Sequence, residues 1–381
     1  MARLLSGAGT ISSRATVNLM DLKDRLSLAT RNTEEVVTID ELRNLLATSS
    51  RPKAYWGFEC SGMMHLGMGL VCGRKIKDLV EAGFDFTVFL ADWHSWINNK
   101  LGGDMERIKL CGGYFKECFT SIGLDPQKVK YAWASELAGE ISYWEKVIRI
   151  AKGATVSRVL RTLPIMGRGL DEAEIETAAM IYPCMQAADI FQMSLDVACA
   201  GIDQRKAHML ARETAEKMRW KKPVCIHTPL LTGLTGPPET LRGVYDEDRE
   251  MSIRIGSKMS KSIPGSSILI HDPEEHIKQK IKNAYCPPKE ARSNPILEIM
   301  KYIILPERGV VTIPRPQKYG GDVTFNNYNT LEIEYVKGSI HPLDLKNAVA
   351  EELASVLEPV REHFRRNPQT LEEMKKIEVT R

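Results

Sequence analysis

Short apolar segments alternate with helical patterns along the first two thirds of the chain. The segments are rich in aromatic and β-branched residues, which is typical of buried strands. Strands that alternate with helices favour a parallel α/β sheet. The five predicted strands cover residues 53–59, 84–90, 130–133, 196–200 and 224–227.

The remaining segments predict the domain organisation. Residues 1–50 read as an N-terminal helical segment, in which Thr38 and Glu41 have the spacing of a capping box. A long basic helical stretch at 141–165 indicates a helical insertion at about 135–180 within a catalytic domain of residues 51–255. Residues 233–255, rich in glycine, proline and acidic side chains, predict a surface excursion. Residues 256–381 carry mostly helical patterns after a short loop and predict a smaller helical module.

Composition narrows the class of protein without assigning a function. The chain has 381 residues, enough for two or more domains, and a net charge of +3, so a nucleic-acid site has to be a local patch. No apolar run reaches the ~20 residues needed to span a bilayer. The eight cysteines form no C-x-x-C pair, which favours buried reduced thiols in a reducing compartment. The first twenty residues have the composition of a transit peptide, but a frayed or misassigned start is the favoured interpretation.

Two short motifs indicate phosphate chemistry. His65-Leu66-Gly67-Met68 follows a strand and a Ser-Gly turn at the start of a helix, where free backbone N–H groups can bind an anion. Lys258-Met259-Ser260-Lys261-Ser262 places two lysines three residues apart in a loop that could close on polyphosphate. Each motif alone is weak, since the first could be an ordinary helix start and the second a solvated basic loop.

Together, in this order and with about 190 residues between them, the two motifs resemble those of the class I aminoacyl-tRNA synthetases. The K-M-S-K-S sequence is complete. The family's usual H-I-G-H motif ends in histidine, whereas this chain has Met68, so only His65 carries over from that pair. The resemblance implies a Rossmann-like parallel-sheet catalytic domain followed by a helical anticodon-binding module. It also implies that His65, Gly67, Lys258, Lys261 and Ser262 bind ATP, with His65 and the two lysines in catalytic roles.

A third pattern bears on which amino acid the protein would bind as its substrate. Tyr182, Gln186 and Asp189 are spaced i, i+4 and i+7 on a predicted helix and therefore share one face. From spacing alone they could be a structural hydrogen-bond cluster or the lining of a pocket for a small polar ligand.

The wider chain resembles the tyrosyl branch of class I in its archaeal and eukaryotic form. The resemblance is carried by AYWGFECSG, LADWHSWINNK, YPCMQAADI, DQRKAHMLARE, KNAYCP, KYGGD and HPLDLKNAVAEEL. It implies a tyrosine pocket in which Tyr55 and Asp189 meet the substrate phenol, while Tyr182, Gln186 and Gln204 hold its ammonium group. Phenylalanine would leave Asp189 and Tyr55 unpaired, and that cost rejects it.

The same resemblance implies activation of L-tyrosine with ATP and Mg²⁺, without a prosthetic group, and transfer to tRNA(Tyr) by a cytoplasmic homodimer that has no membrane partner. It predicts contacts of Arg161, Arg205 and Lys206 with the acceptor stem, and of Tyr319, His341 and Asp344 with the anticodon. No metal-ligating cluster is expected. Three alternatives stay open: a tryptophan–tRNA ligase of the same fold, a nucleotidyltransferase without an RNA partner, and a non-catalytic RNA-binding relative.

Overall fold

The computed structural model describes residues 20–169, 174–238, 243–263 and 265–377. The two interpretations of the N-terminal start fall mainly on residues 1–19, outside the described residues. The eight cysteines are all free thiols, and six of them are buried, as the sequence predicted. No described helix combines the length and apolar character needed to cross a bilayer.

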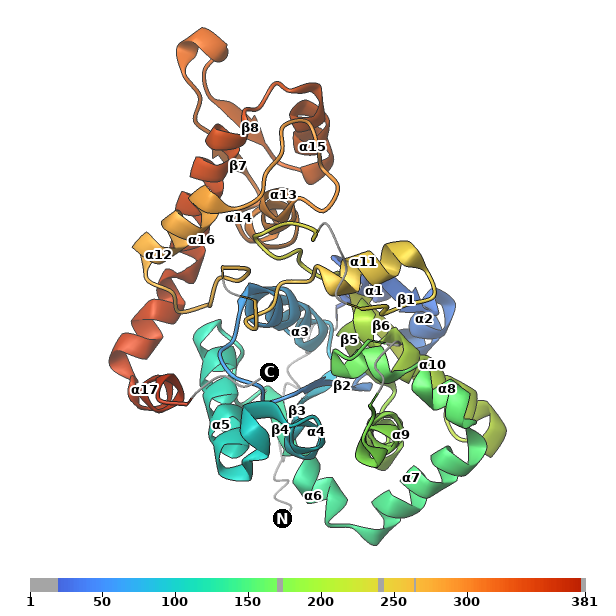
Figure 1. Ribbon diagram of the computed structural model, residues 1–381. Coiled ribbons are helices and arrows are strands. Elements are labelled where there is room, and N and C mark those ends of the chain that lie inside the picture. The colour runs from blue at the N-terminus through green and yellow to red at the C-terminus, as the bar shows by residue number, and fades with distance from the viewer. Residues whose placement is uncertain (1–19, 170–173, 239–242, 264, 378–381) are drawn as a thin grey trace, which may run out of the picture.

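A six-stranded sheet lies at the centre of the first module, in the order β1-β6-β5-β2-β3-β4 (Figure 1). Strands β2 to β6 run parallel, which confirms the predicted α/β sheet, and β1 pairs antiparallel with β6 at one edge. The five predicted strands are confirmed, with ends that differ by at most one residue. The strands are β1 (Glu35–Val37), β2 (Lys53–Phe58), β3 (Asp85–Leu90), β4 (Val129–Trp133), β5 (Val197–Gly201) and β6 (Val224–Thr228).

Helices cover both faces of this sheet, because alternate side chains of each strand point to opposite faces. Trp56 and Phe58 of β2 pack in one core with α3 and α5, while Tyr55 packs in a second core with α7, α9 and α10. The helices of this module are α1 (Leu22–Thr30), α2 (Ile39–Thr48), η1 (Gly67–Cys72), α3 (Gly73–Glu81), α4 (Asp92–Ile97), η2 (Lys100–Gly103), α5 (Met105–Ser121), α6 (Ala134–Ala138), α7 (Ile141–Gly153), α8 (Val156–Leu160), η3 (Leu163–Met166), α9 (Thr177–Gln192), η4 (Ile202–Gln204), α10 (Arg205–Met218) and α11 (Arg249–Gly256).

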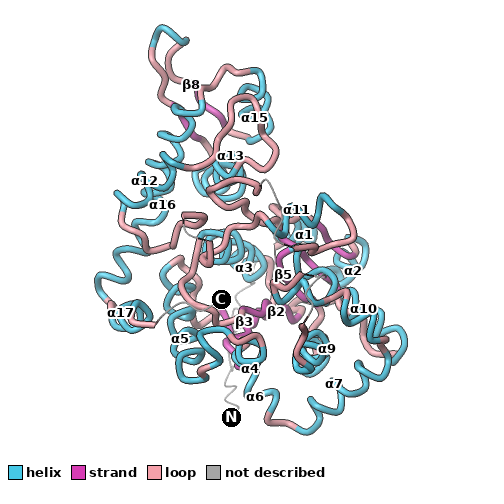
Figure 2. Tube along the Cα trace, in the orientation of Figure 1, coloured by secondary structure: helices cyan, strands magenta, loops and turns pink. Residues whose placement is uncertain are grey.

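The second module is mainly helical and lies at the top of Figure 1, and its long helix α16 runs back along the first module so that α17 lies beside α5. Figure 2 shows that loops and short helices make up most of the remaining chain there. The elements are α12 (Glu274–Asn283), α13 (Pro295–Ile299), η5 (Met300–Ile304), α14 (Leu305–Arg308), β7 (Val311–Ile313), η6 (Gln317–Tyr319), β8 (Val323–Phe325), α15 (Tyr328–Lys337), α16 (Pro342–Arg366) and α17 (Gln369–Lys375).

Three segments differ from the sequence-based expectation. The N-terminal segment contains strand β1 between its two helices, although the predicted capping box of Thr38 and Glu41 is present. The stretch 141–165 is three helices rather than one, because α7 ends at Gly153, Thr155 caps the separate helix α8, and Pro164 lies in the short helix η3. The C-terminal module contains the hairpin of β7 and β8.

Candidate active site

A cavity of about 830 Å³ opens at the carboxyl ends of β2, β5 and β6. Strand order reverses between β2 and β5, and ligands of open α/β sheets bind at such a point. The cavity brings together all ten residues predicted for tyrosine and ATP, from segments far apart in the sequence. They are Tyr55, His65, Gly67, Tyr182, Gln186, Asp189, Gln204, Lys258, Lys261 and Ser262.

A buried carboxylate lies at the closed end of this cavity. Asp189 is 1% exposed, and its Oδ1 accepts a hydrogen bond of 2.9 Å from the Tyr143 hydroxyl. The Nε2 atom of His94 lies 3.3 Å from Oδ2, at ion-pair distance. Burial lowers the pKa of His94, but the Asp189 carboxylate more than offsets that effect, and the net pKa is raised. Burial also raises the pKa of Tyr55, which therefore keeps its hydroxyl proton.

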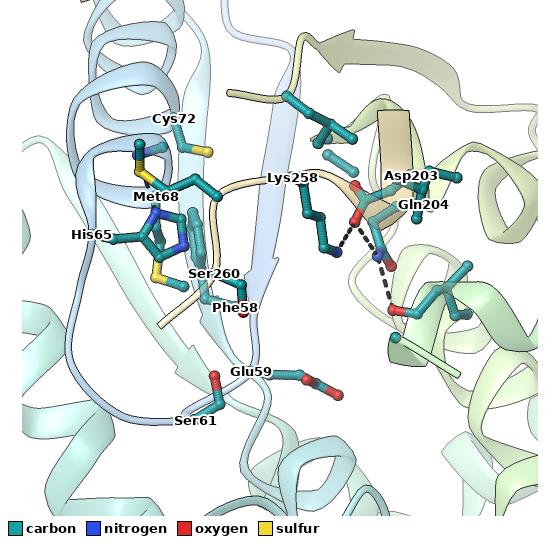
Figure 3. A pocket seen from close by; sticks show the side chains of 18 of the residues that line it. Phe58, Glu59, Ser61, His65, Met68, Cys72, Asp203, Gln204, Lys258 and Ser260 are labelled. Atoms are coloured by element: carbon teal, nitrogen blue, oxygen red, sulfur yellow. Dashed lines mark hydrogen bonds and ion pairs between the residues drawn. The ribbon is translucent and has the colours of Figure 1, made fainter. Parts of the chain in front are cut away.

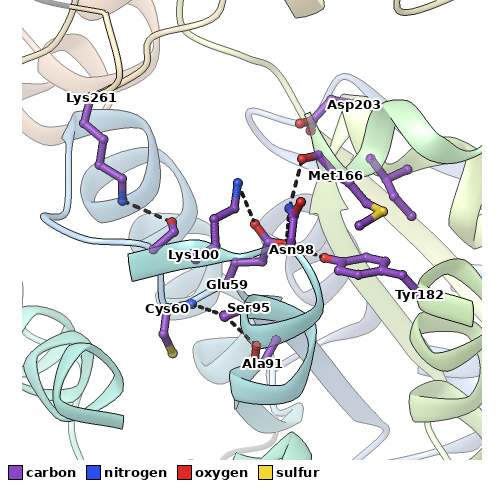
Figure 4. A network of polar contacts seen from close by, with 12 residues as sticks. Glu59, Cys60, Ala91, Ser95, Asn98, Lys100, Met166, Tyr182, Asp203 and Lys261 are labelled. Carbon is purple, nitrogen blue, oxygen red and sulfur yellow. Dashed lines mark hydrogen bonds and ion pairs between the residues drawn. The ribbon is translucent and has the colours of Figure 1, made fainter. Parts of the chain in front are cut away.

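A network of polar side chains around Glu59 lines the cavity next to Asp189 (Figure 4). Glu59 Oε1 accepts hydrogen bonds from the Tyr182 hydroxyl at 2.7 Å and from Asn98 Nδ2 at 2.9 Å, and Lys100 lies 3.6 Å from Oε2. The hydrogen bond to Glu59 therefore fixes the orientation of the Tyr182 hydroxyl.

The two predicted glutamines contact each other. Gln186 Nε2 donates to Gln204 Oε1 at 3.3 Å, and Gln204 Nε2 donates to the Ile165 carbonyl at 2.9 Å. The buried Oε1 of Gln186 has no hydrogen-bond partner among the described residues. A buried acceptor without a partner costs free energy, so this oxygen is suited to a donor on a ligand.

The histidine turn forms the opposite wall (Figure 3). His65 Nδ1 accepts a hydrogen bond of 3.2 Å from the Gly67 N–H, which places the imidazole proton on Nε2. Burial, with the nearby charges of Lys261 and Lys258, lowers the pKa of His65 to about 3, so the ring is neutral. A Cβ at Gly67 would lie 3.1 Å from His65 Cε1, so glycine lets the ring fold back over the turn.

The lysine loop directly follows α11 and is held against the histidine turn. Lys258 Nζ forms an ion pair of 2.7 Å with Asp203, whereas Lys261 Nζ donates to the neutral Ser61 Oγ at 3.1 Å and the Met63 carbonyl at 3.3 Å. Burial lowers the pKa of Lys258, but Asp203 more than offsets this and the net pKa is raised. Burial lowers the pKa of Lys261 to about 8.

The residues predicted to contact tRNA do not line this cavity. Arg161 ends α8, and Arg205 and Lys206 begin α10, directly after Gln204. Both α10 residues are paired with acidic groups: Arg205 with Glu35, and Lys206 with Asp246 and Glu247 at 3.1 and 2.7 Å.

The predicted anticodon residues lie in the second module. Tyr319 is 64% exposed at the end of η6, His341 caps α16 by accepting from the Leu343 N–H, and Asp344 lies in the first turn of that helix. Arg315, just before η6, donates to the Ser339 carbonyl, just before α16, at 2.6 Å and so connects the segment of Tyr319 to the segment of His341 and Asp344. Their roles stay predictions.

Glu59, His94 and Asp203 line the cavity but were not predicted from the sequence, and Asn98, which donates to Glu59, lies just beside them. Glu59 ends the AYWGFE run, and His94 follows the apolar strand and Asp92, so each stands where a parallel strand ends. Their position at the carboxyl end of a parallel strand is the signal by which they could have been found in the sequence, because ligands bind at those ends. Among residues that the structure describes, no group of three or more histidine, cysteine, aspartate or glutamate side chains could hold a metal ion.

Comparison with known proteins gives the family. The sequence profile described as "tRNA synthetases class I (W and Y)" matches residues 48–238 and 250–358. A tyrosine–tRNA ligase of Saccharolobus solfataricus is 48% identical over 94% of this chain and 97% of its own length. One of Sulfolobus acidocaldarius is 46% identical over 94% of this chain and 99% of its own.

Solved structures agree with the sequence comparison. A tyrosyl-tRNA synthetase from Pyrococcus horikoshii, complexed with L-tyrosine, has a TM-score of 0.86 and 45% identity, covering 94% of this chain and all of that one. A tryptophanyl-tRNA synthetase from Aeropyrum pernix, with a TM-score of 0.65 and 18% identity over 91% of this chain and 86% of its own, shares the fold alone. The Rossmann-like sheet, the cavity at its switch point and these matches place the chain in the class I aminoacyl-tRNA synthetase family of the tryptophanyl and tyrosyl enzymes.

Proposed function

We propose that this chain is a tyrosine–tRNA ligase, which activates L-tyrosine with ATP to tyrosyl-adenylate and pyrophosphate and then transfers tyrosine to the 3′ end of tRNA(Tyr). The observation that carries the proposal is that one cavity has residues suited to a phenol at one end and residues suited to phosphate at the other. Asp189 and Tyr55 lie buried at one end, and His65, Lys258 and Lys261 lie at the other. The relatives at 48% and 46% identity carry the same activity in their names.

The closed end suits a phenol. Asp189 accepts a hydrogen bond through Oδ1 from Tyr143, and a carboxylate has further lone pairs for a phenolic O–H. The Tyr55 hydroxyl, protonated as described above, can donate to the phenol oxygen. The unpaired Gln186 Oε1 is an acceptor for the ammonium group, beside Tyr182 and Gln204.

The activation step needs positioning and charge stabilisation more than a general base. The tyrosine carboxylate is ionised at neutral pH and attacks the α-phosphorus of ATP, with pyrophosphate as the leaving group. The His65 Nε2–H, the Gly67 backbone, Ser262 and the two lysines surround the space for the phosphates. Donors aimed at charge that grows in the transition state lower the barrier. We expect Mg²⁺ to arrive on the ATP phosphate oxygens, which are the hard ligands it prefers.

The first prediction is tyrosine-dependent ATP–pyrophosphate exchange by the purified chain. Exchange is measured as incorporation of labelled pyrophosphate into ATP, with tyrosine, tryptophan and phenylalanine compared at equal concentrations. Tyrosine is expected to support exchange, because Tyr55 and Asp189 form a donor–acceptor pair that fits a hydroxyl. Exchange with tryptophan but not tyrosine would favour the tryptophan–tRNA ligase alternative. Exchange with none of the three would favour a non-catalytic relative.

The second prediction concerns the acceptor patch of Arg161, Arg205 and Lys206. Arg205→Ala is expected to lower kcat/KM for tRNA(Tyr) charging about tenfold, as expected for loss of a charged hydrogen bond, and to leave exchange nearly intact, since Arg205 lies outside the cavity. Arg107→Ala, which removes an exposed arginine of α5 that pairs with Asp104, is the control and should charge normally. Equal loss of exchange and charging in Arg205→Ala would place this arginine in the amino-acid step instead.

The second module supplies the proposed anticodon contacts. The exposed Tyr319 ring can stack on an unpaired base, and Asp344 can accept from the Watson–Crick edge of a guanine, with His341 beside it on α16. This division corresponds to an N-terminal segment of residues 1–50, a catalytic domain of 51–255 and a lysine loop with anticodon-binding domain of 256–381. Strand β1 attaches the first of these to the catalytic sheet.

We also propose a cytoplasmic homodimer. Large apolar residues are exposed on α7 and on α4, α8 and α9, and the other three helices all contact α9; apolar exposure of this kind is typical of a protein–protein interface. Trp96 packs edge-on against Trp93, which in turn contacts Trp144 of α7. These exposed apolar residues are Trp96, Ile141, Ile148, Val156 and Ile181.

A further inference from the structure

Two adjacent carboxylates at the start of the edge strand β1 reach different functional elements: Glu35 is the first residue of the strand, and Glu34 directly precedes it. Glu35 contacts Arg205 at the start of α10, and Glu34 contacts Arg254 on α11. One short segment at the start of β1 therefore contacts two elements at once. The strand itself is fixed to β6, because Glu34 N donates to the His227 carbonyl at 2.8 Å and Glu35 pairs with His227 in register.

Glu35 orients the Arg205 guanidinium through its inner nitrogen. Arg205 Nε donates to both carboxylate oxygens of Glu35, at 3.0 and 2.8 Å. The terminal nitrogens Nη1 and Nη2 donate to no acceptor among the described residues, and the side chain is 44% exposed. These two nitrogens form the fork that recognises phosphate or a guanine edge. Glu35 therefore holds the arginine while it leaves the nucleic-acid-binding edge open.

Two buried histidines fix Glu35 in turn. His227 Nδ1 lies 2.9 Å from Glu35 Oε2, and His227 Nε2 lies 3.0 Å from His208 Nδ1. When His227 donates to the carboxylate, its Nε2 accepts from His208, whose own Nε2 is left without a partner among the described residues. These hydrogen bonds, from His227 first and Arg205 second, lower the pKa of Glu35 to about 2, so the carboxylate is charged at neutral pH.

Glu34 holds the helix that leads into the lysine loop. Its two carboxylate oxygens accept from Arg254 Nη1 and Nη2 at 2.8 and 2.9 Å, the bidentate geometry that gives an ion pair directional strength. Both side chains are less than one third exposed. Arg254 lies four residues before Lys258, and the Ser257 hydroxyl between them donates to the Arg254 carbonyl at 3.4 Å.

We propose that Glu34 and Glu35 are positioning residues for the two steps of the reaction, Glu34 through Arg254 for ATP and Glu35 through Arg205 for tRNA. The inference rests on the proposed function of the lysine loop and the acceptor patch. Neither carboxylate lines the cavity, so each acts through the arginine that it holds. Figure 1 shows α11 and α10 on either side of the sheet edge that carries β1 and β6.

The test compares Glu34→Gln, Glu35→Gln and the control Asp40→Asn in the full chain. Asp40 also pairs with an arginine, Arg43, but at an exposed site. Glu34→Gln is expected to lower kcat/KM for ATP in pyrophosphate exchange about tenfold, the size expected for a charged hydrogen bond. Glu35→Gln is expected to leave exchange within twofold and to lower kcat/KM for tRNA charging by about the same factor. Asp40→Asn should change neither.

Double variants separate positioning from general destabilisation. Glu34→Gln combined with Arg254→Gln should lose no more exchange than either single variant, because both remove one interaction. Glu35→Gln should likewise add nothing to the charging defect of Arg205→Ala. Parallel loss of both activities in Glu35→Gln, additive double variants, or behaviour of either Glu variant like Asp40→Asn would overturn the proposal. If the wild-type chain performed no tyrosine-dependent exchange, the proposed function would fail instead.

Discussion

Replacing Lys261 with alanine is expected to lower kcat of tyrosine-dependent pyrophosphate exchange by about 10²- to 10³-fold, the usual effect of removing one donor aimed at developing charge. The ammonium group has only neutral partners, the Ser61 hydroxyl and the Met63 carbonyl. Its positive charge is therefore available to the phosphates. Lys258 differs, since Asp203 already neutralises it at 2.7 Å. We expect Lys258→Ala to have the smaller effect.

Initial exchange rates at varied ATP and tyrosine concentrations check this ranking. KM for tyrosine should change little in Lys261→Ala, because the phenol and ammonium contacts lie elsewhere in the cavity. Lys278→Ala is the matched control, since Lys278 is a lysine of the same module that pairs with Glu274 and Glu351 on the surface. A larger loss in Lys258→Ala than in Lys261→Ala would show that the paired lysine leaves Asp203 during the reaction and is the dominant one.

The parallel sheet could be predicted because its signal is local. Each of the strands β2 to β6 is an apolar run that a reader can see in the sequence, and each was found to within one residue at its ends. Strand β1 could not be found in this way. It has three residues, two of its neighbours are polar, and its pairing with β6 joins segments about 190 positions apart. Such a strand exists only because tertiary structure provides a partner.

The residues of the candidate active site also divide into those with a local sequence signal and those that only the tertiary structure brings together. The spacing of Tyr182, Gln186 and Asp189 on α9 predicted one shared face, and all three line the cavity. Tyr143 was missed, although its hydroxyl holds Asp189, because α7 reaches α9 across 46 positions of sequence. Periodicity reports which residues of one helix share a face, but it does not report what packs opposite them.

The carboxylate pair Glu34 and Glu35 gives a further example. In the sequence these residues are two acids in a polar segment before a helix. Their partners Arg205 and Arg254 lie 170 and 220 positions away. A charged residue in an isolated sequence reads as part of a solvated surface, and only the fold shows which arginine it meets.

Asp189→Ala is expected to lower kcat/KM for tyrosine about 10- to 100-fold and to reduce the preference for tyrosine over phenylalanine. Tyrosine loses a charged acceptor for its phenolic O–H, which is worth about 1.5–3 kcal/mol. Phenylalanine cannot satisfy Asp189, so removal of the carboxylate removes a penalty from that substrate. Tyrosyl-tRNA synthetases are a known case of a site that rejects the analogue without a hydroxyl. The ratio of the two kcat/KM values in pyrophosphate exchange measures the change.

The neighbours of Asp189 determine how the result is interpreted. Removal of the carboxylate leaves the Tyr143 hydroxyl and the His94 ring without their charged partner in a buried site, so stability has to be followed by thermal unfolding. Asp189→Asn keeps an acceptor for Tyr143 and separates packing from charge. If Asp189→Asn unfolds like the wild type but loses selectivity, the negative charge selects the phenol. Unchanged selectivity in both variants would remove Asp189 from substrate recognition and leave it a structural partner of Tyr143.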